Sequence, residues 1–303
     1  MNMKKKNIFI SIVIIVFVVG LVVGIFYYHN TYRDKNTTPT PLFPLGVWWW
    51  GENENIDKYL EFAKQNGINE IYYSNSSFDE SINKFISKAN SLNIKVYFLC
   101  GEYTWIEDES GFYDIVEKYL EYQQTFENTF SGIHLDVEPH QHPDWKENDE
   151  IRKREILASY INFVYNITNA DKLKDTTLDF DIPFWLYDYI IDFNGEEKEA
   201  YKYIIDYADR VFVMSYRDNA ERIFDCAQNE LEYSNNLNKK LFLCVETSAS
   251  SETESVTFYE EGKEYMYQEL ETLKDIISSN YGEQFQNYGF SIHHMKSWYE
   301  LID

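Results

Sequence analysis

The segment 132–138 (GIHLDVE) carries an ionisable side chain at every second position, between apolar residues. Alternate side chains of a β-strand share a face, so His134, Asp136 and Glu138 would lie together while the apolar residues face the opposite way. Burying three ionisable groups in a row costs free energy that only a function would explain. We therefore predict acid–base chemistry for this trio, centred on Glu138. A satisfied internal ion network is the alternative.

Other candidate catalytic side chains also close apolar runs. Glu246 falls near the end of the run 240–247, and Tyr216 ends the run 210–216. Hydrolysis of a bond between sugars requires two carboxyl groups, one protonated as an acid and one ionised as nucleophile or base. The four residues that we predict to be catalytic are Asp136, Glu138, Tyr216 and Glu246.

Aromatic and polar residues near the same run ends are candidates for binding a substrate. Aromatic rings can serve as platforms for the apolar faces of sugars, although a ring-rich core explains the 18% aromatic content more simply. Alternation lets only part of Trp48–Trp50 face a cleft, and we favour Trp48 or Trp50. For Arg217 the default expectation is a salt bridge with Asp218 at the rim. The predicted substrate-binding residues are His134, Trp48, Trp50, Asp181, Arg217, His293, His294 and Trp298.

Eight short apolar runs must hold these residues in place. They are rich in Val, Ile, Phe and Tyr, as buried parallel strands are, and segments with helical spacing separate them. Their ranges are 45–50, 70–75, 95–101, 132–138, 177–185, 210–216, 240–247 and 289–294. The pattern predicts one α/β domain at residues 44–303, a (β/α)8 (TIM) barrel with its active site at the carboxyl ends of the strands. A doubly wound sheet is the alternative, but the first run lacks a glycine-rich phosphate loop after it.

An uncharged apolar segment precedes the barrel. Residues 8–28 would span roughly 30 Å as a helix, which is the thickness of a bilayer core. The lysines Lys4–Lys6 predict that residues 1–7 stay in the cytoplasm. A cleavable signal peptide is the alternative, but no small-residue cleavage site follows the segment. We predict a single-pass signal-anchor helix in the cell membrane, a flexible stalk at 29–43 and a barrel on the extracytoplasmic side.

The charge balance limits the partners. The chain has 51 acidic and 27 basic residues and a formal net charge of −24 at pH 7. Such a surface repels nucleic acid and disfavours polyuronates, whereas neutral and amino sugars are compatible with it. The cysteines Cys100, Cys226 and Cys244 show no C-x-x-C spacing, and we expect no metal ion and no cofactor. Neither charge nor spacing indicates an oligomeric state.

The fourth run resembles the fourth strand of family 18 chitinases, which carries D-G-x-D-x-D-x-E. The segment 131–138 (SGIHLDVE) keeps the glycine, the last aspartate and the glutamate, while Ser131 and His134 replace two aspartates. Met214-Ser215-Tyr216 is similar to the M-x-Y motif of the sixth strand in that family. Trp298 is similar to the tryptophan that follows the eighth strand in that family and forms the floor of its sugar-binding site.

This resemblance implies roles for three residues. Glu138 would be the general acid, and Asp136 would orient the N-acetyl group of the substrate. The oxygen of that group would be the nucleophile, with Tyr216 assisting. Ser131 and His134 replace two of the three aspartates of the motif, so this sequence departs from the pattern that accompanies the substrate-assisted mechanism.

A second resemblance is to the clan of retaining barrels with an acid Glu after strand four and a nucleophile Glu after strand seven. Glu138-Pro139 is similar to the N-E-P motif of that clan, with Val137 in the place of Asn, and Glu246 falls where the nucleophile lies. Both resemblances imply a glycoside hydrolase acting on a glycan, and both assign the central role to Glu138.

Two alternatives stay open. Five of the six histidines lie near runs four and eight, so a metal-dependent hydrolase, such as a polysaccharide deacetylase or phosphodiesterase, is one of them. The other is a non-catalytic carbohydrate-binding barrel, although barrels of that kind lose the catalytic glutamate that Glu138 would supply.

Overall fold

The structure is a computed structural model that describes residues 45–51, 55–147, 149–251 and 253–302. Parallel strands form a closed barrel in the order β1-β10-β9-β8-β5-β4-β3-β2. These strands are β1 (Leu45–Trp50), β2 (Glu70–Ser74), β3 (Lys95–Cys100), β4 (Ile133–Leu135), β5 (Leu178–Pro183), β8 (Arg210–Met214), β9 (Lys240–Glu246) and β10 (Tyr288–His293). Each of the eight predicted runs supplies one strand, so the predicted barrel is confirmed.

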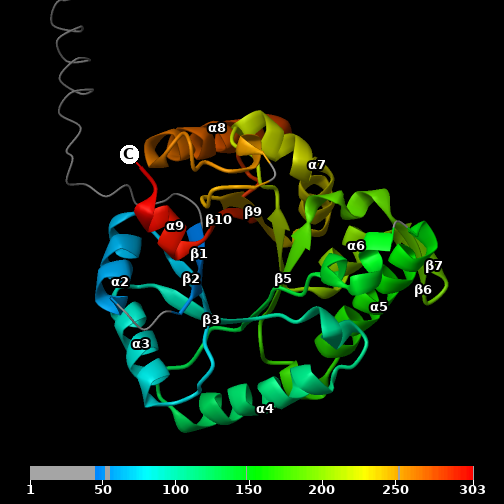
Figure 1. Ribbon diagram of the computed structural model, residues 1–303, viewed down its shortest axis with the longest axis horizontal. Helices are drawn as coiled ribbons and strands as arrows, with labels where there is room; N and C mark the ends of the chain where they lie inside the picture. Colours follow the sequence, from blue (N-terminus) through cyan, green and yellow to red (C-terminus); the bar gives the residue numbers. More distant parts are fainter. Residues whose placement is uncertain (1–44, 52–54, 148, 252, 303) are drawn as a thin grey trace, which may run out of the picture. The chain divides into compact units, whose positions relative to one another are not determined.

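Helices form a ring around the strands (Figure 1). They are α2 (Ile56–Gln65), α3 (Glu80–Ser91), α4 (Ser110–Thr125), α5 (Glu150–Thr168), α6 (Ala200–Tyr207), α7 (Ala220–Leu237), α8 (Lys263–Tyr281) and α9 (Met295–Glu300). Each of them follows a barrel strand in the chain, which is the alternation that the sequence predicts.

Alternation along the strands divides the core into two layers. Leu135 of β4 and Trp49 of β1 pack in the large apolar layer between the strands and the helices. His134 and Trp48, each one residue earlier, lie inside the barrel with a smaller aromatic cluster, and the His134 ring stacks on Tyr72 at 4.1 Å between ring centroids. The predicted register of the fourth strand is therefore confirmed.

Buried charges of alternating sign run through the barrel interior. The Arg210 guanidinium on β8 donates to Glu70 on β2 and to Asp179 on β5, each at 2.7 Å. Asp179 Oδ2 lies 3.4 Å from His134 Nδ1, and His134 Nε2 lies 2.9 Å from Asp181 Oδ2. All five side chains are buried. The interior can hold these charges because each one lies next to a charge of opposite sign.

A two-stranded hairpin interrupts the connection from β5 to α6. Its antiparallel strands are β6 (Ile190–Phe193) and β7 (Glu196–Glu199). The turn residues Asn194 and Gly195 both have positive φ angles, 55° and 81°, as a tight hairpin turn requires. The sequence analysis did not predict this hairpin.

The predicted cytoplasmic tail, the apolar segment 8–28 and the stalk 29–43 lie outside the described residues. Within the part of the chain that the structure describes, no helix has both the length and the apolar character needed to cross a membrane.

Candidate active site

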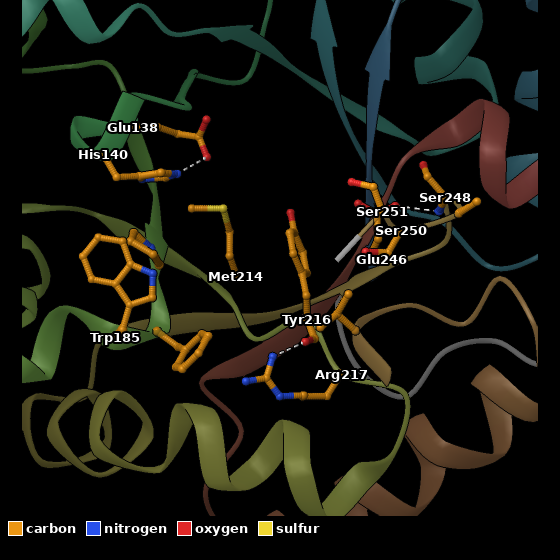
Figure 2. Close-up of a pocket in the computed structure, with 14 residues that line it drawn as sticks. Glu138, His140, Trp185, Met214, Tyr216, Arg217, Glu246, Ser248, Ser250 and Ser251 are labelled. Atoms are coloured by element: carbon orange, nitrogen blue, oxygen red, sulfur yellow. Dashed lines mark hydrogen bonds and ion pairs between the residues drawn. The ribbon is translucent and has the colours of Figure 1, made fainter. Parts of the chain in front are cut away.

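A cavity of about 430 Å³ opens at the carboxyl ends of four neighbouring strands, β4, β5, β8 and β9 (Figure 2). Catalytic residues of (β/α)8 barrels lie at this end. The cavity is lined by Glu138, His140, Pro183, Phe184, Trp185, Met214, Tyr216, Arg217, Glu246, Ser248, Ala249, Ser250, Ser251 and Val256. Two carboxyl groups, those of Glu138 and Glu246, therefore line one cavity from separate strands.

Glu138 follows β4 and reaches the cavity beside a short 3-10 turn, Pro139–Gln141. His140 Nε2 lies 3.4 Å from one carboxylate oxygen of Glu138 (Figure 2). The side-chain amide of Gln141 donates to the other carboxylate oxygen. Behind the turn, the end of β3 approaches closely at Gly101, where a Cβ atom would collide with the carbonyl oxygen of Asp136. Only glycine fits this approach, which fixes the backbone that carries Glu138.

Asp136 lies two residues before Glu138, on the same side of the chain. Burial raises the pKa of the Asp136 carboxyl well above its usual value, and the negative charges of Asp181 and Glu138 raise it further. The raised pKa favours the protonated form of Asp136, which can donate a hydrogen bond. It does not belong to the lining of the cavity.

Glu246, at the end of β9, is held in its ionised form. His293 Nδ1 lies 2.6 Å from its Oε2, and the backbone N–H groups of Thr247 and Ser248 donate to its Oε1 at 2.8 and 2.6 Å. Burial alone would raise the pKa of Glu246. The hydrogen bond and charge of His293, with the Ser248 N–H, outweigh burial and lower this pKa below its usual value.

Tyr216 follows β8, and Figure 2 shows its ring between Glu138 and Glu246. The ring packs against the aromatic cluster inside the barrel. Burial raises the pKa of the Tyr216 hydroxyl well above its usual value, and the nearby Cys244 and Glu246 raise it further. The hydroxyl therefore keeps its proton and can donate a hydrogen bond to negative charge that develops in the cavity.

Three predicted substrate-binding residues lie beneath the cavity, and their predicted direct contact with substrate is corrected. Trp48, His134 and Asp181 are buried and are absent from the lining. Burial would lower the pKa of His134, but Asp181 and Asp179 raise it to about 9. The protonated ring then donates to Asp181, and the Trp48 indole N–H donates to the same carboxylate at 3.2 Å.

Trp50, His293 and His294 gather at the ends of β1 and β10. Trp50 is 41% exposed, and its ring centroid lies 5.0 Å from that of His293 and 5.7 Å from that of His294. His293 pairs with Glu246, while His294 caps α9 together with Ser297. Of the three, Trp50 presents an exposed ring, and His293 acts on the cavity through Glu246.

Trp298 is placed away from the cavity, and its predicted role as the floor of a sugar site is wrong. It is fully buried in the layer outside the barrel. Its ring packs on Phe62 of α2 at 4.5 Å between centroids, and its indole N–H donates to the Tyr267 hydroxyl at 3.2 Å. The chain enters α9 at Met295, directly after the last strand, so Trp298 belongs to a helix face that packs on α2.

The sequence analysis missed the aromatic wall of the cavity. Phe184 and Trp185 belong to a 3-10 turn (Phe184–Asp188) that follows β5. The centroid of the Trp185 ring lies 5.6 Å from that of the His140 ring and 5.3 Å from that of the Trp145 ring. Pro183 could have indicated this turn in the sequence. Proline lacks the N–H that a strand needs, so Pro183 marks the end of β5.

The histidines near β4 do not form a metal site with their neighbours. His140 lies against Glu138, and His142 Nε2 lies 3.0 Å from Glu107. Among the residues that the structure describes, no group of three or more His, Cys, Asp or Glu side chains is arranged to hold a metal ion. The metal-hydrolase alternative thus has no ligand set in this part of the chain.

No protein-family model matches the sequence, and no curated protein matches it. A calcium-binding mutant of Bacteroides uniformis β-glucuronidase 2 is similar in structure, with a TM-score of 0.56, 12% identity, and coverage of 84% of this chain and 30% of that one. The Bacillus megaterium QM B1551 spore cortex-lytic enzyme SleL matches with a TM-score of 0.49, 12% identity, and coverage of 85% and 73%. A class V chitinase from Pseudomonas fluorescens Pf-5 matches with a TM-score of 0.43, 18% identity, and coverage of 67% and 68%.

These comparisons concern the fold. The chain has a (β/α)8 barrel, and it spans less than a third of the β-glucuronidase chain. Function depends on the site that a particular sequence builds on this fold.

Proposed function

We propose that this chain is a membrane-anchored glycoside hydrolase whose barrel acts outside the cytoplasm, on a glycan with a neutral or amino-sugar backbone. The observation that carries the proposal is that Glu138 and Glu246 line one cavity at the carboxyl end of the barrel. Two carboxyl groups beside one sugar are what hydrolysis of a glycosidic bond requires.

The surroundings of the carboxyl groups support a division of labour. Burial and the charges of Asp181 and Glu138 favour the protonated form of Asp136, whereas Glu246 is ionised. In the proposed mechanism, Glu138 protonates the leaving oxygen of the glycosidic bond. Glu246 acts on the opposite side of the sugar as nucleophile or base, and Tyr216 donates a hydrogen bond to developing negative charge.

The N-terminal segment supports anchoring. Residues 8–28 carry no charge and follow Lys4–Lys6, a pattern that keeps the N-terminus in the cytoplasm. We expect the full-length protein to stay with membranes after alkaline carbonate washing and to be digested by protease added outside the cell. A variant without residues 1–36 that stays equally bound to membranes would contradict the anchor.

A screen of neutral and amino-sugar polymers tests the activity. The full-length protein is incubated with each polymer, and newly released reducing ends are measured with and without a chelator. We expect hydrolysis of at least one polymer and no effect of the chelator. Release of acetate or phosphate without new reducing ends, lost in chelator and restored by zinc, would favour the metal-dependent alternative.

A further inference from the structure

Arg217 lies in the same cavity as the two carboxyl groups. Its Nη1 donates to the carbonyl oxygen of Tyr216 at 2.6 Å, and its guanidinium lies 4.9 Å from the centre of the Phe184 ring. Trp185, the residue after Phe184, also lines this cavity (Figure 2). The cation is therefore held in place beside the aromatic wall.

Arg217 has no acidic partner within the described residues. Its neighbour Asp218 lies 3.5 Å from Arg222 instead, so the predicted salt bridge between Arg217 and Asp218 is not formed. By contrast, Arg152 and Arg210 each contact at least two carboxylates. In a chain with 51 acidic and 27 basic residues, an arginine that lines a cavity without an acid partner has donors to spare for a ligand.

We propose that Arg217 binds a carboxylate carried by the substrate, in a subsite walled by Phe184 and Trp185. An arginine fork matches the two oxygens of a carboxylate, and aromatic rings take the apolar face of the sugar that carries it. The substrate class is thus a glycan with a neutral or amino-sugar backbone that bears isolated carboxylate groups. This inference rests on the proposed function and names its substrate class.

The net charge of the chain selects isolated carboxylates over a polyuronate. A polyanion would meet repulsion along its whole length from a protein with a net charge of −24. Salt screens this long-range field over about 8 Å at physiological ionic strength. A single carboxylate in direct contact with Arg217 keeps its local attraction.

Paired oligosaccharides with the same backbone test the subsite. One pair is N-acetylglucosamine oligomers with and without a lactyl ether carboxylate on alternate sugars. The other is cello-oligosaccharides with and without one C6 carboxylate. The readout is the ratio of kcat/KM between the acidic and neutral members of each pair, measured on the full-length protein.

We expect at least one pair in which the acidic member is preferred by about tenfold or more, the effect of one charge-assisted hydrogen bond. Arg217→Gln reduces that ratio to about one, because the variant loses the preference for the acidic member. Arg154→Gln is the matched control, because Arg154 is exposed, has no ion pair in the described chain and lies outside the cavity lining. It leaves the ratio unchanged.

Two results would overturn the inference, and they are distinguishable. Turnover of neutral members with no acidic preference, or a preference that survives Arg217→Gln, removes the carboxylate subsite and leaves the proposed hydrolase intact. Absence of turnover on every pair and on the polymer screen removes the proposed function, and the subsite with it.

Discussion

His293 Nδ1 lies 2.6 Å from Oε2 of Glu246, and this pairing joins the last strand of the barrel to the carboxylate that lines the cavity. β10 and β9 are neighbours in register, with His293 directly opposite Glu246. The pair therefore follows from strand order. The ionised carboxylate of Glu246 has its partner on the neighbouring strand rather than on a loop.

Replacing His293 by Asn shifts the acid limb of the pH profile. His293 lowers the pKa of Glu246, so its removal raises that pKa and Glu246 becomes protonated at a higher pH. Because the reaction needs Glu246 ionised, the acid limb of kcat/KM moves to higher pH. The measurement is the pH dependence of kcat/KM for both proteins. An acid limb that stays in place would show that Glu246 does not control it.

Replacing Tyr216 by Phe removes one hydrogen-bond donor from the cavity. We expect kcat to fall by about 10²-fold with a small change in KM, because the donated bond strengthens as negative charge develops. Tyr165→Phe, on the partly exposed face of α5, is the control and leaves both constants unchanged. Equal losses in the two variants would remove Tyr216 from the mechanism.

Replacing Arg210 by Gln tests the buried chain of charges. The change leaves Glu70 and Asp179 inside the barrel without their cation, which costs about 3–5 kcal/mol of unfolding free energy. Urea denaturation monitored by circular dichroism measures it. Arg222→Gln, which removes an exposed ion pair, changes stability by less than about 1 kcal/mol. A cost at Arg210 no larger than that would contradict the pairing.

Glu230 gives a pH-dependent prediction outside the cavity. It is fully buried in α7, and neither of its carboxyl oxygens has a hydrogen-bond partner among the described residues. Burial raises its pKa to about 8. The unfolded chain releases this proton near pH 4.5, while the folded chain keeps it until about pH 8. The wild-type protein therefore loses stability as the pH rises between these values.

Glu230→Gln removes that loss. We expect the variant to match the wild type near pH 4.5 and to exceed it by about 2–4 kcal/mol at pH 8, measured by urea denaturation at both pH values. The exposed Glu232→Gln variant serves as the control and shows no such pH dependence. A stability difference between Glu230→Gln and the wild type that does not grow with pH would show that Glu230 is not protonated in the folded protein.

The barrel strands could be predicted because both sides of each strand are buried. Their sequences are nearly continuous apolar runs, and the few polar positions, such as Asp179 and His134, all point inward. The hairpin of β6 and β7 was missed because its strands are short and its second strand, Glu196–Glu199, is charged. Its Asn194-Gly195 turn was visible in the sequence as a hairpin signal.

The site could be predicted only where strand alternation controls it. Glu138 and Glu246 line the cavity because they close strands whose register the apolar residues fix. Trp298 and Trp185 depend on where a helix or a 3-10 turn begins after a strand, and apolar periodicity does not determine that position. The same limit explains why Trp48, inside the barrel, and Trp50, exposed at its end, could not be told apart.

The most direct test of the account is glycan hydrolysis by Glu138→Gln compared with Glu102→Gln. Glu102 follows β3 at the same end of the barrel, is exposed and does not line the cavity, so it is a matched strand-end glutamate. On a polymer that the wild type hydrolyses, we predict that Glu138→Gln abolishes release of reducing ends, with an unchanged circular dichroism spectrum, while Glu102→Gln retains it. Hydrolysis by Glu138→Gln at the wild-type rate would contradict the central role of Glu138.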